Sequence, residues 1–272
     1  MTAGPFAGTA RWIAAARARE SLRPDRLFDD PYAAALAGPA GVAAMEASER
    51  AAGGENRFLP VRTRWFDDVL VDAAAGVDQA VLLGAGLDTR AFRLPLPERL
   101  RLYEVDQAAV MEEKERTLAR LGARPRCRRA GVSADLAGAW TPALLAAGFD
   151  PSVRTAWLAE GLLFYLAEEA VRALLREAAR LSAGGGLFAA DMFGTGVRAQ
   201  PAMASHLAWR ERAGLPPPFA TDDPAGLLAA CGWRPARITG PGAPDASFGR
   251  LPVTRQTPAP GPDRSHLVTA TA

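Results

Sequence analysis

The sequence has few of the residues that build metal sites and disulfide frameworks. Its two cysteines, Cys127 and Cys231, and its two histidines, His206 and His266, lie far apart along the 272 residues. This spacing fits neither a disulfide scaffold nor a familiar zinc-binding motif. We therefore expect no metal at the functional site.

Long apolar runs are also missing. No window approaches the roughly eighteen uninterrupted apolar residues of a membrane-spanning helix. Residues 1–8 contain no basic segment followed by a long apolar core, so they are not typical of a signal peptide. We expect a cytoplasmic protein without a membrane partner.

Lysine and asparagine are almost absent as well. Lys114 is the only lysine and Asn56 the only asparagine, whereas alanine and arginine abound, a usage that we interpret as the coding bias of a GC-rich genome. The net charge of +2 gives no reason to expect a nucleic-acid partner. The 49% hydrophobic and 23% charged residues that are present are typical of a globular protein.

The chain after Gln79 alternates predicted strands with predicted helices. The predicted strands lie at 79–84, 101–105, 126–132, 154–159 and 186–191, and the helices at 106–121, 138–147 and 167–182. A helix from Thr221 to Ala230 then precedes strands near 234–239 and 264–271. This pattern predicts an α/β fold with a doubly wound, mostly parallel, seven-stranded sheet whose last strand is antiparallel.

The first seventy-six residues are predicted to be helical, with residues 40–58 as weak helix and loop. Capping and breaking residues predict three helices, which run from Thr9 to about Leu22, from Pro31 to a break at Gly38-Pro39, and from Thr63 to Gly76.

A Gly-x-Gly turn, Gly84-Ala85-Gly86, directly follows the first predicted strand. Glycine tolerates a positive φ and lets the backbone approach a ligand closely, although ordinary strand-to-helix turns also contain Gly and Asp. Asp88 follows and can bond to backbone or ligand. Thr89 stands where a dinucleotide fingerprint has its third glycine. A nucleoside without a pyrophosphate therefore fits this turn better than a dinucleotide.

Acidic residues follow the next two strands. Glu104 and Asp106 are two residues apart, so their side chains share one face, where a carboxylate could bind both hydroxyls of a ribose. Asp135 and Leu136 could meet an adenine. Asp106 could also cap the helix that follows it, and Asp135 could instead be only a helix cap.

The fourth strand ends in Glu160, and Tyr165 follows shortly after. Buried polar groups need partners, so we expect both side chains to face the crevice. An arginine near the first strand, Arg62 or Arg64, or one of the first helix, Arg17 or Arg19, could bind a free carboxylate, although a single arginine more often covers a solvated face.

These stretches together resemble the leucine carboxyl methyltransferase-like family, a branch of the class I S-adenosylmethionine-dependent methyltransferases, and in it the bacterial small-molecule members. The stretches that carry the resemblance are 9–20, 27–33, 61–68, Leu83-Gly84-Ala85-Gly86-Leu87-Asp88-Thr89-Arg90, 103–106 and Ala159-Glu160-Gly161-Leu162-Leu163-Phe164-Tyr165-Leu166. The resemblance covers nearly the whole chain and is weakest in the C-terminal third. The part with which eukaryotic members contact a protein C-terminus has no match here.

The resemblance implies S-adenosylmethionine as cofactor and S-adenosylhomocysteine as product. It implies the following roles: Arg17 (or Arg19) and Arg62 for the methionine carboxylate, Gly84 and Gly86 beside the cofactor, Asp106 for the ribose, Asp135 and Leu136 for the adenine, Glu160 for the amino group, and Tyr165 near the transferred methyl. We add Asp88 and Glu104 as further candidates for cofactor binding.

Methyl transfer needs no base when the acceptor is a carboxylate, because a carboxyl group with a pKa of about 4 is ionised at neutral pH. We therefore expect esterification of a small carboxylic acid, with Tyr165 orienting the acceptor oxygen. A phenol acceptor with His206 as base is the alternative. An NAD-dependent oxidoreductase is less favoured, because the sequence has no Tyr-x-x-x-Lys pair. A binding protein without turnover is a further alternative.

Large apolar residues are expected to line the acceptor pocket. The candidates are Met192, Phe193, Met203, His206, Trp209 and Phe219. Such a lining favours a flat, apolar acid of the aromatic polyketide type, as in antibiotic biosynthesis. We expect one domain, 1–272, in a monomer or homodimer. Its parts are a helical cap (1–76), a cofactor-binding core (77–192), a lid and substrate segment (193–222) and a C-terminal helix with strands (223–272).

Overall fold

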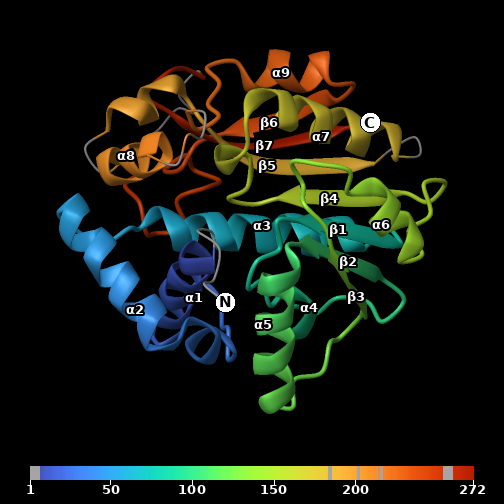
Figure 1. Cartoon of the computed structure of the whole chain (residues 1–272), viewed down its shortest axis with the longest axis horizontal. Coiled ribbons are helices and arrows are strands. Elements are labelled where there is room, and N and C mark those ends of the chain that lie inside the picture. Colours follow the sequence, from blue (N-terminus) through green and yellow to red (C-terminus); the bar gives the residue numbers. More distant parts are fainter. Residues whose placement is uncertain (1–6, 183–185, 201–202, 213, 215–216, 254–259) are drawn as a thin grey trace.

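A computed structural model describes residues 7–182, 186–200, 203–212, 214, 217–253 and 260–272. Within these residues a seven-stranded sheet has the order β3-β2-β1-β4-β5-β7-β6 (Figure 1). The strands are β1 (Gln79–Leu83), β2 (Arg101–Asp106), β3 (Arg128–Ser133), β4 (Thr155–Ala159), β5 (Leu187–Phe193), β6 (Arg234–Thr239) and β7 (Ser265–Thr271). Only β7 runs antiparallel to its neighbours β5 and β6 in this part of the chain. The predicted fold class is confirmed.

Helices cover both faces of this sheet. They are α1 (Ala7–Ser21), α2 (Ala33–Ala52), α3 (Phe58–Ala74), α4 (Arg90–Arg93), α5 (Ala108–Arg120), α6 (Thr141–Ala146), α7 (Glu168–Arg180), α8 (Ala204–Arg212) and α9 (Pro224–Ala230), with 3-10 turns η1 (Leu163–Tyr165) and η2 (Thr195–Ala199). Alternate residues of β1 enter different cores: Leu82 packs in a cluster with α1 and α3, and Leu83 in a cluster with α6, α7 and α9. This two-residue period is why the strand is buried along its whole length.

The N-terminal helices differ in part from the prediction. Helix α2 continues to Ala52 through a kink at Gly38, whose φ of 57° lies in the left-handed region, so residues 40–52 are helical rather than weak helix and loop. A Cβ atom at Gly41 would lie 2.6 Å from the carbonyl oxygen of Arg11. This close packing of α2 on α1 stabilises a segment whose own sequence contains helix breakers.

Two predicted helix boundaries in this region are wrong. Helix α3 begins at Phe58, so Thr63 lies inside it, and the residue that ends it, Ala75, has an ordinary right-handed conformation. Gly76 has no positive φ. Pro60 in the first turn is compatible with the earlier start, because the first N–H groups of a helix have no partner within it.

Three predicted boundaries in the later part of the chain also differ from the structure. Asp223, not Thr221, caps α9 by accepting a bond from the amide of Gly226. Helix α6 begins at Thr141, so Asp135 does not cap it. Strand β5 extends to Phe193, which places Met192 and Phe193 in the sheet.

Candidate functional site

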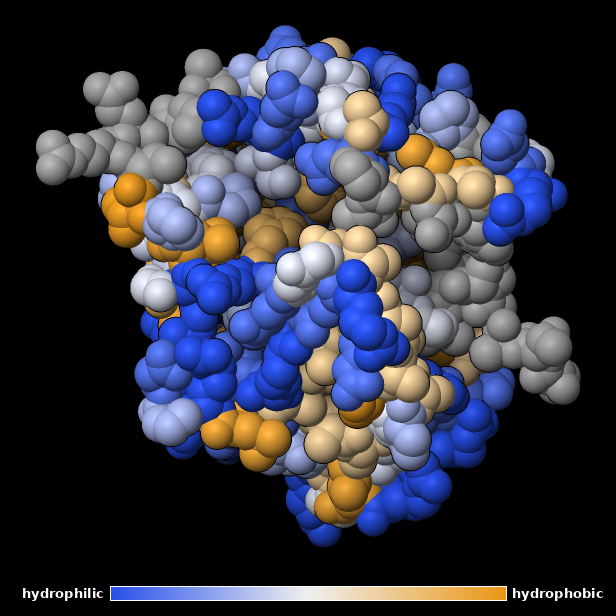
Figure 2. All heavy atoms as spheres, turned by 90° about the vertical axis from the view of Figure 1, so that its left-hand side faces the viewer, coloured by the Kyte–Doolittle hydropathy of each residue, from blue (hydrophilic) through white to orange (hydrophobic). Residues whose placement is uncertain are grey.

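A cavity of about 1730 Å³ opens at the carboxyl ends of the parallel strands. It lies where β1 is flanked by β2 and β4, the point at which the strand order reverses and at which open α/β sheets bind ligands. Its walls also include residues of α1, α2, α3, α8 and the segment 241–252. Figure 2 faces the side of the molecule formed by α1, α2 and α8 and shows apolar atoms recessed between more polar surroundings.

The Gly-x-Gly turn forms one wall of the cavity. Gly84 and Gly86 have φ values of 67° and 50°, which disfavour residues that carry a Cβ. A Cβ at Gly84 would also lie 2.8 Å from Leu162 Cδ1. The turn is held by Asp106, whose carboxylate accepts bonds from the amides of Gly86 (2.6 Å) and Gln107 (2.7 Å).

Asp106 lies at the end of β2 and lines the cavity, as predicted. Burial raises the pKa of Asp106 above its usual value, against the two amides that lower it. Asp135 and Leu136 follow β3 and line the same cavity, and the Asp135 carboxylate accepts a bond from the amide of Ala137 (3.0 Å).

Glu104 does not line the cavity. It is 0% exposed, and its carboxylate accepts bonds from Lys114 Nζ (2.5 Å) and Arg129 Nη2 (2.7 Å). Glu104 was a further candidate for cofactor binding, but it lies two residues before Asp106 inside the strand and is bound by two cations. Glu104 is therefore a core ion-pair residue, and it has no part in the binding scheme below.

A buried network of arginines and carboxylates forms the floor of the cavity. Arg90, which is buried, binds Asp88, Asp67 (2.7 Å) and Glu160 (2.7 Å). Its Nη2 also donates to the backbone oxygen of Thr63 (3.1 Å), which joins α3 to the turn after β1. Arg90 thus fixes the carboxylates that follow β1 and β4 in one arrangement.

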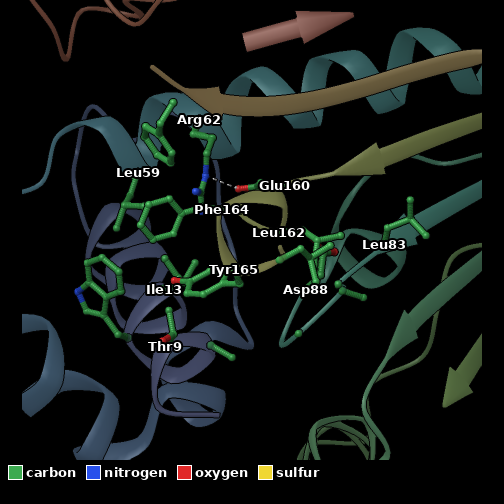
Figure 3. Close-up of a pocket in the computed structure, with 18 of the residues that line it drawn as sticks. Thr9, Ile13, Leu59, Arg62, Leu83, Asp88, Glu160, Leu162, Phe164 and Tyr165 are labelled. Atoms are coloured by element: carbon green, nitrogen blue, oxygen red, sulfur yellow. Dashed lines mark hydrogen bonds and ion pairs between the residues drawn. The ribbon is translucent and has the colours of Figure 1, made fainter. Parts of the chain in front are cut away.

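Arg62 and Arg17 belong to the same network. Arg62 donates to Glu160 (3.0 Å) and to Asp191 of β5 (3.2 Å), and Figure 3 shows its guanidinium pointing at Glu160. Arg17 donates to Asp30 (2.8 Å) and to the backbone oxygen of Leu87 (2.6 Å). Arg62 and Arg17 both line the cavity, as predicted, and both already bind protein carboxylates.

The electrostatic balance of this network favours a cation in the cavity. Its members are the arginines Arg17, Arg62, Arg90 and Arg93 and the carboxylates Asp30, Asp67, Asp88, Glu160 and Asp191. The formal charges therefore leave one negative charge in excess, although burial raises the pKa of Asp191 above its usual value, against Arg62 and the amide of Gly161. Burial alone would raise the pKa of Asp88, but the charges of Arg90, Lys114 and other cations lower it to about 2. The pKa of Glu160 is also lowered, since Arg90 and Arg62 outweigh its burial. Both carboxylates remain ionised at neutral pH.

Tyr165 lies where the cavity meets the N-terminal helices. Its side chain is hydrogen-bonded to Thr9 of α1, and Figure 3 shows it close to Thr9 and Ile13. Burial raises the pKa of Tyr165 above its usual value of 10.0. The phenol is therefore protonated at neutral pH and suits hydrogen bonding rather than proton abstraction.

The rest of the lining is mostly apolar. Phe193 packs edge-on against Phe58 and Phe164, with ring centroids 6.2 Å and 5.5 Å apart. Trp12, Ile13, Leu59, Val197 and Met203 complete this wall. It lies beside Tyr165, so one cavity holds a charged floor and an apolar compartment.

The residues predicted for the acceptor pocket are not all placed at the cavity. Phe193 and Met203 line the cavity. Met192 is buried in the core on the opposite face of the sheet, because neighbours in a strand point to opposite sides and Met192 precedes Phe193. Phe219 is buried in the same core cluster. His206 and Trp209 lie on α8, and their side chains fall outside the described part of the chain.

Some residues of the site were not predicted from the sequence. Asp191 and Arg210 carried no motif, and Asp67 was quoted only as part of the stretch 61–68. Arg90 was quoted only as part of the Asp-Thr-Arg string, and this string was the signal that could have identified it. Among the described residues, no group of three His, Cys, Asp or Glu side chains could hold a metal ion. No described helix is long and apolar enough to cross a membrane.

Comparison with known proteins decides the family. The family model of leucine carboxyl methyltransferase matches residues 10–179. The chain belongs to the leucine carboxyl methyltransferase family. The matched residues contain the Gly-x-Gly turn, Asp106, Asp135 and Glu160, which form the charged part of the cavity.

Other members of this family are close in sequence. A candidate S-adenosyl-L-methionine-dependent methyltransferase from Parafrankia sp. (strain EAN1pec) is 50% identical over 189 residues, which are 66% of this chain and 60% of that protein. One from Saccharopolyspora erythraea is 48% identical over 189 residues, 67% of this chain and 66% of that protein. The chain thus spans less than two thirds of the length of these two curated relatives.

Solved structures share the fold. A DUF574 family protein from Streptomyces avermitilis has a TM-score of 0.64 at 16% identity, over 97% of this chain and 96% of that chain. A candidate methyltransferase from Thermobifida fusca has a TM-score of 0.62 at 17% identity, over 96% and 93% of the two chains. These likenesses agree with the seven-stranded topology of this family member.

Proposed function

We propose that this family member is an S-adenosylmethionine-dependent methyltransferase that esterifies the carboxylate of a small apolar acid. The observation that carries the proposal is the position of Asp106, Asp88 and Glu160 around one cavity at the carboxyl ends of β2, β1 and β4. The family membership and the curated relatives, named as candidate S-adenosyl-L-methionine-dependent methyltransferases, support the same cofactor.

The residues around the cavity fit S-adenosylmethionine. This cofactor carries a sulfonium and an ammonium, and the network holds one formal negative charge in excess. The glycine turn leaves room beside the backbone, since a Cβ at Gly86 would meet another atom only at 3.7 Å. The residues proposed to hold it are Asp106 for the ribose, Asp135 and Leu136 for the adenine, Glu160 and Asp88 for the amino group, Arg62 and Arg17 for the carboxylate, and Gly84 and Gly86 along its length.

The bound cofactor would supply a methyl group on a positively charged sulfur. A lone pair of a correctly held acceptor oxygen would form the new C–O bond, and the electron pair of the C–S bond would remain on sulfur. No proton moves when the acceptor is a carboxylate. The protein has to hold the acceptor in line with the methyl group and exclude water. Tyr165, protonated at neutral pH, can orient the acceptor oxygen by a hydrogen bond.

The lining favours a carboxylate over a phenol. A phenol needs a general base, and the acids of the floor, Asp88 and Glu160, are bound by arginines. The aromatic wall of Phe58, Phe164 and Phe193 suits a flat, apolar acid, of which aromatic polyketides are one class.

Calorimetry with S-adenosylmethionine and with NAD tests the cofactor. The protein should bind the former and not the latter, and Asp106→Asn should weaken binding by about tenfold or more, the effect of losing one charge-assisted bond. Glu46→Gln, an exposed change on α2, should leave the affinity unchanged. Binding of NAD alone would contradict the proposal.

Mass spectrometry after incubation with S-adenosylmethionine and a panel of aromatic acids tests the acceptor. The expected product is heavier by the mass of one methylene group and returns to the acid on base hydrolysis. A base-stable methyl ether would instead indicate a phenol acceptor. Cofactor binding without turnover on any acid would indicate a binding protein.

A further inference from the structure

The cavity has room for a second molecule beside the cofactor. Its volume of about 1730 Å³ exceeds the roughly 300–1,000 Å³ of a pocket that holds one small ligand. Its lining side chains are exposed at two places. At the first, Gln107, Asp135 and Ala137 line the cavity and are exposed. They adjoin Asp106 and Leu136, the residues proposed for the ribose and the adenine, so we call this opening the cofactor mouth.

The second set of exposed lining residues lies near the end of α2. Ala47, Ser48 and Ala51 line the cavity and are exposed. They belong to the face of the molecule that Figure 2 shows. All three have small side chains. We call this opening the α2 mouth.

Helix α1 lies between the two mouths. Figure 1 shows it between α2 and α5. Ala10 of α1 lies over the glycine turn, since a Cβ at Gly86 would be 3.7 Å from its own Cβ. One residue later, Arg11 binds Glu113 of α5 (2.7 Å). Helix α1 therefore covers the middle of the cavity and leaves one mouth on each side.

The aromatic wall starts at Tyr165. The ring of Phe164 lies 5.5 Å from that of Tyr165 and 5.5 Å from that of Phe193, measured between centroids. Phe193 in turn lies 6.2 Å from Phe58 at the start of α3. Neighbouring rings are edge-on, so the wall presents a continuous apolar surface that leads away from Tyr165.

This wall ends at the α2 mouth. The amide of Phe58 donates to the side chain of Asn56 (3.1 Å), which also lines the cavity. The amide of Asn56 donates to the carboxylate of Glu49 (3.1 Å). Glu49 directly follows Ser48 of the α2 mouth. An apolar path thus runs from Tyr165 to the surface beside α2.

We propose that the methyl acceptor occupies this path, with its carboxyl group at Tyr165 and an apolar tail that reaches the α2 mouth. This inference rests on the proposed function and narrows the acceptor to elongated acids. The aromatic rings suit the apolar body of such an acid, and the small side chains of the α2 mouth leave space for its tail. The cofactor uses the other mouth, so the two ligands enter and leave independently.

The first test compares two acids that share a flat body and differ in a tail. Calorimetry measures the binding of biphenyl-4-carboxylate and 4′-hexyloxybiphenyl-4-carboxylate to protein saturated with S-adenosylhomocysteine. The acid with the tail should bind at least as tightly as the short acid, because its methylene groups lie along an open apolar path. The inference is wrong if the tail weakens binding, or if wild-type protein binds neither acid.

The second test places a bulky group at the α2 mouth. Both native cysteines are buried, so a cysteine introduced at an exposed position reacts selectively with fluorescein-5-maleimide. Modification of Ala51→Cys should weaken binding of the acid with the tail by about tenfold, the effect of displacing about two methylene groups. The affinity for S-adenosylhomocysteine should stay the same. The same folded variant is measured before and after modification, so a folding defect cannot produce the difference.

Ala43→Cys is the matched control. Ala43 is an exposed alanine of α2 that does not line the cavity. Its modification should leave the binding of both acids and of S-adenosylhomocysteine unchanged. The separate path is refuted if modified Ala51→Cys keeps its affinity for the acid with the tail, or loses affinity for S-adenosylhomocysteine to the same extent.

Failure of this inference can be told apart from failure of the proposed function, because both tests measure binding. Tail-dependent binding that modified Ala51→Cys loses, without formation of an ester by wild-type protein, would contradict the function and leave the acceptor path standing. Esterification of biphenyl-4-carboxylate by a protein that excludes the acid with the tail would contradict the path and leave the function standing.

Discussion

At the scale of single residues, Arg90 holds the charged floor together. It binds three carboxylates from α3, from the turn after β1 and from the end of β4, and all four side chains are buried or nearly so. A buried charge that loses its partner keeps the cost of desolvation without the compensating attraction. Arg90 is therefore important for stability as well as for the shape of the cavity.

Replacement of Arg90 should destabilise the protein strongly. We expect Arg90→Gln to lower the free energy of unfolding by about 3–5 kcal/mol, since it leaves Asp88 and Glu160 without their main cation. Urea denaturation followed by circular dichroism measures this. Arg180→Gln, which removes an exposed pair with Glu177, should cost less than about 1 kcal/mol. Equal losses in the two variants would show that the network contributes no more than a surface pair.

The pH dependence of stability follows from Asp88. Its pKa is lowered from 3.8 to about 2, so the stabilisation by this carboxylate is fully present above pH 3.8 and is lost as the pH falls to 2. The shift corresponds to about 2 kcal/mol. In Asp88→Asn the free energy of unfolding should therefore fall less steeply between pH 4 and pH 2 than in wild-type protein. Urea titrations across this pH range measure the free energy of unfolding of both proteins. An equal fall in wild type and Asp88→Asn would contradict a lowered pKa of Asp88.

The residues of the site that follow a strand could be predicted, because a parallel sheet brings all its carboxyl ends to one edge. Asp106, Asp135 and Glu160 are of this kind. Asp191 and Arg210 could not, because their partners are distant in sequence and no motif links them. Glu104 was misjudged, since its proximity to Asp106 said nothing about Lys114 and Arg129, which bind it.

At the scale of elements, the sheet was predicted more accurately than the N-terminal helices. A buried strand can be recognised in a sequence as a short apolar run between turn residues. Helix α2 contains Gly38, Pro39 and Gly41, which argue against a helix locally. The packing of α2 on α1 stabilises the helix in spite of these residues, and such tertiary packing cannot be predicted from the local sequence.

Gly41 should tolerate no side chain. Alanine is the better helix former, yet its Cβ at position 41 would lie 2.6 Å from a backbone oxygen of α1. We expect Gly41→Ala to destabilise the protein by about 1–3 kcal/mol, the usual cost of overpacking. Gly8→Ala in α1, where a Cβ meets nothing within 4 Å, should be neutral or slightly stabilising. Thermal unfolding of the two variants measures the difference. A Gly41→Ala protein as stable as wild type would show that the two helices separate readily.

At the scale of the whole molecule, the cavity is closed by parts of the chain that are far apart. The family model ends at residue 179, whereas α8 and the segment 241–252 lie beyond it and contribute to the cavity lining. Arg250 joins this later segment to the N-terminal region: it donates to Glu20 (2.7 Å) and to the Asp25 side chain (2.9 Å). The segment that contributes Leu251 and Pro252 to the cavity is thus tied to the end of α1 and the residues that follow it.

Loss of the contacts of Arg250 with Glu20 and Asp25 should make the segment 240–253 more mobile. We expect Arg250→Gln to raise the rate of amide hydrogen exchange in residues 240–253, while the affinity for S-adenosylmethionine changes little, because the cofactor floor lies elsewhere. Stability should fall by more than about 1 kcal/mol, because the pair with Asp25 is exposed but the change also leaves the buried carboxylate of Glu20 without this cation. Arg234→Gln, which removes an exposed bond to Ala272 near the end of the chain, is the control. Unchanged exchange in 240–253 would contradict a closing role for Arg250.

The contacts assigned to the cofactor also bear on turnover. Transfer of a methyl group from a sulfonium to a carboxylate removes one positive and one negative charge from the ligands at the same moment. The ribose, adenine, amino group and carboxylate of the cofactor remain, and these are the groups to which the proposed binding residues are assigned. Under the proposed function, S-adenosylhomocysteine should therefore compete with S-adenosylmethionine for the cavity as a product inhibitor.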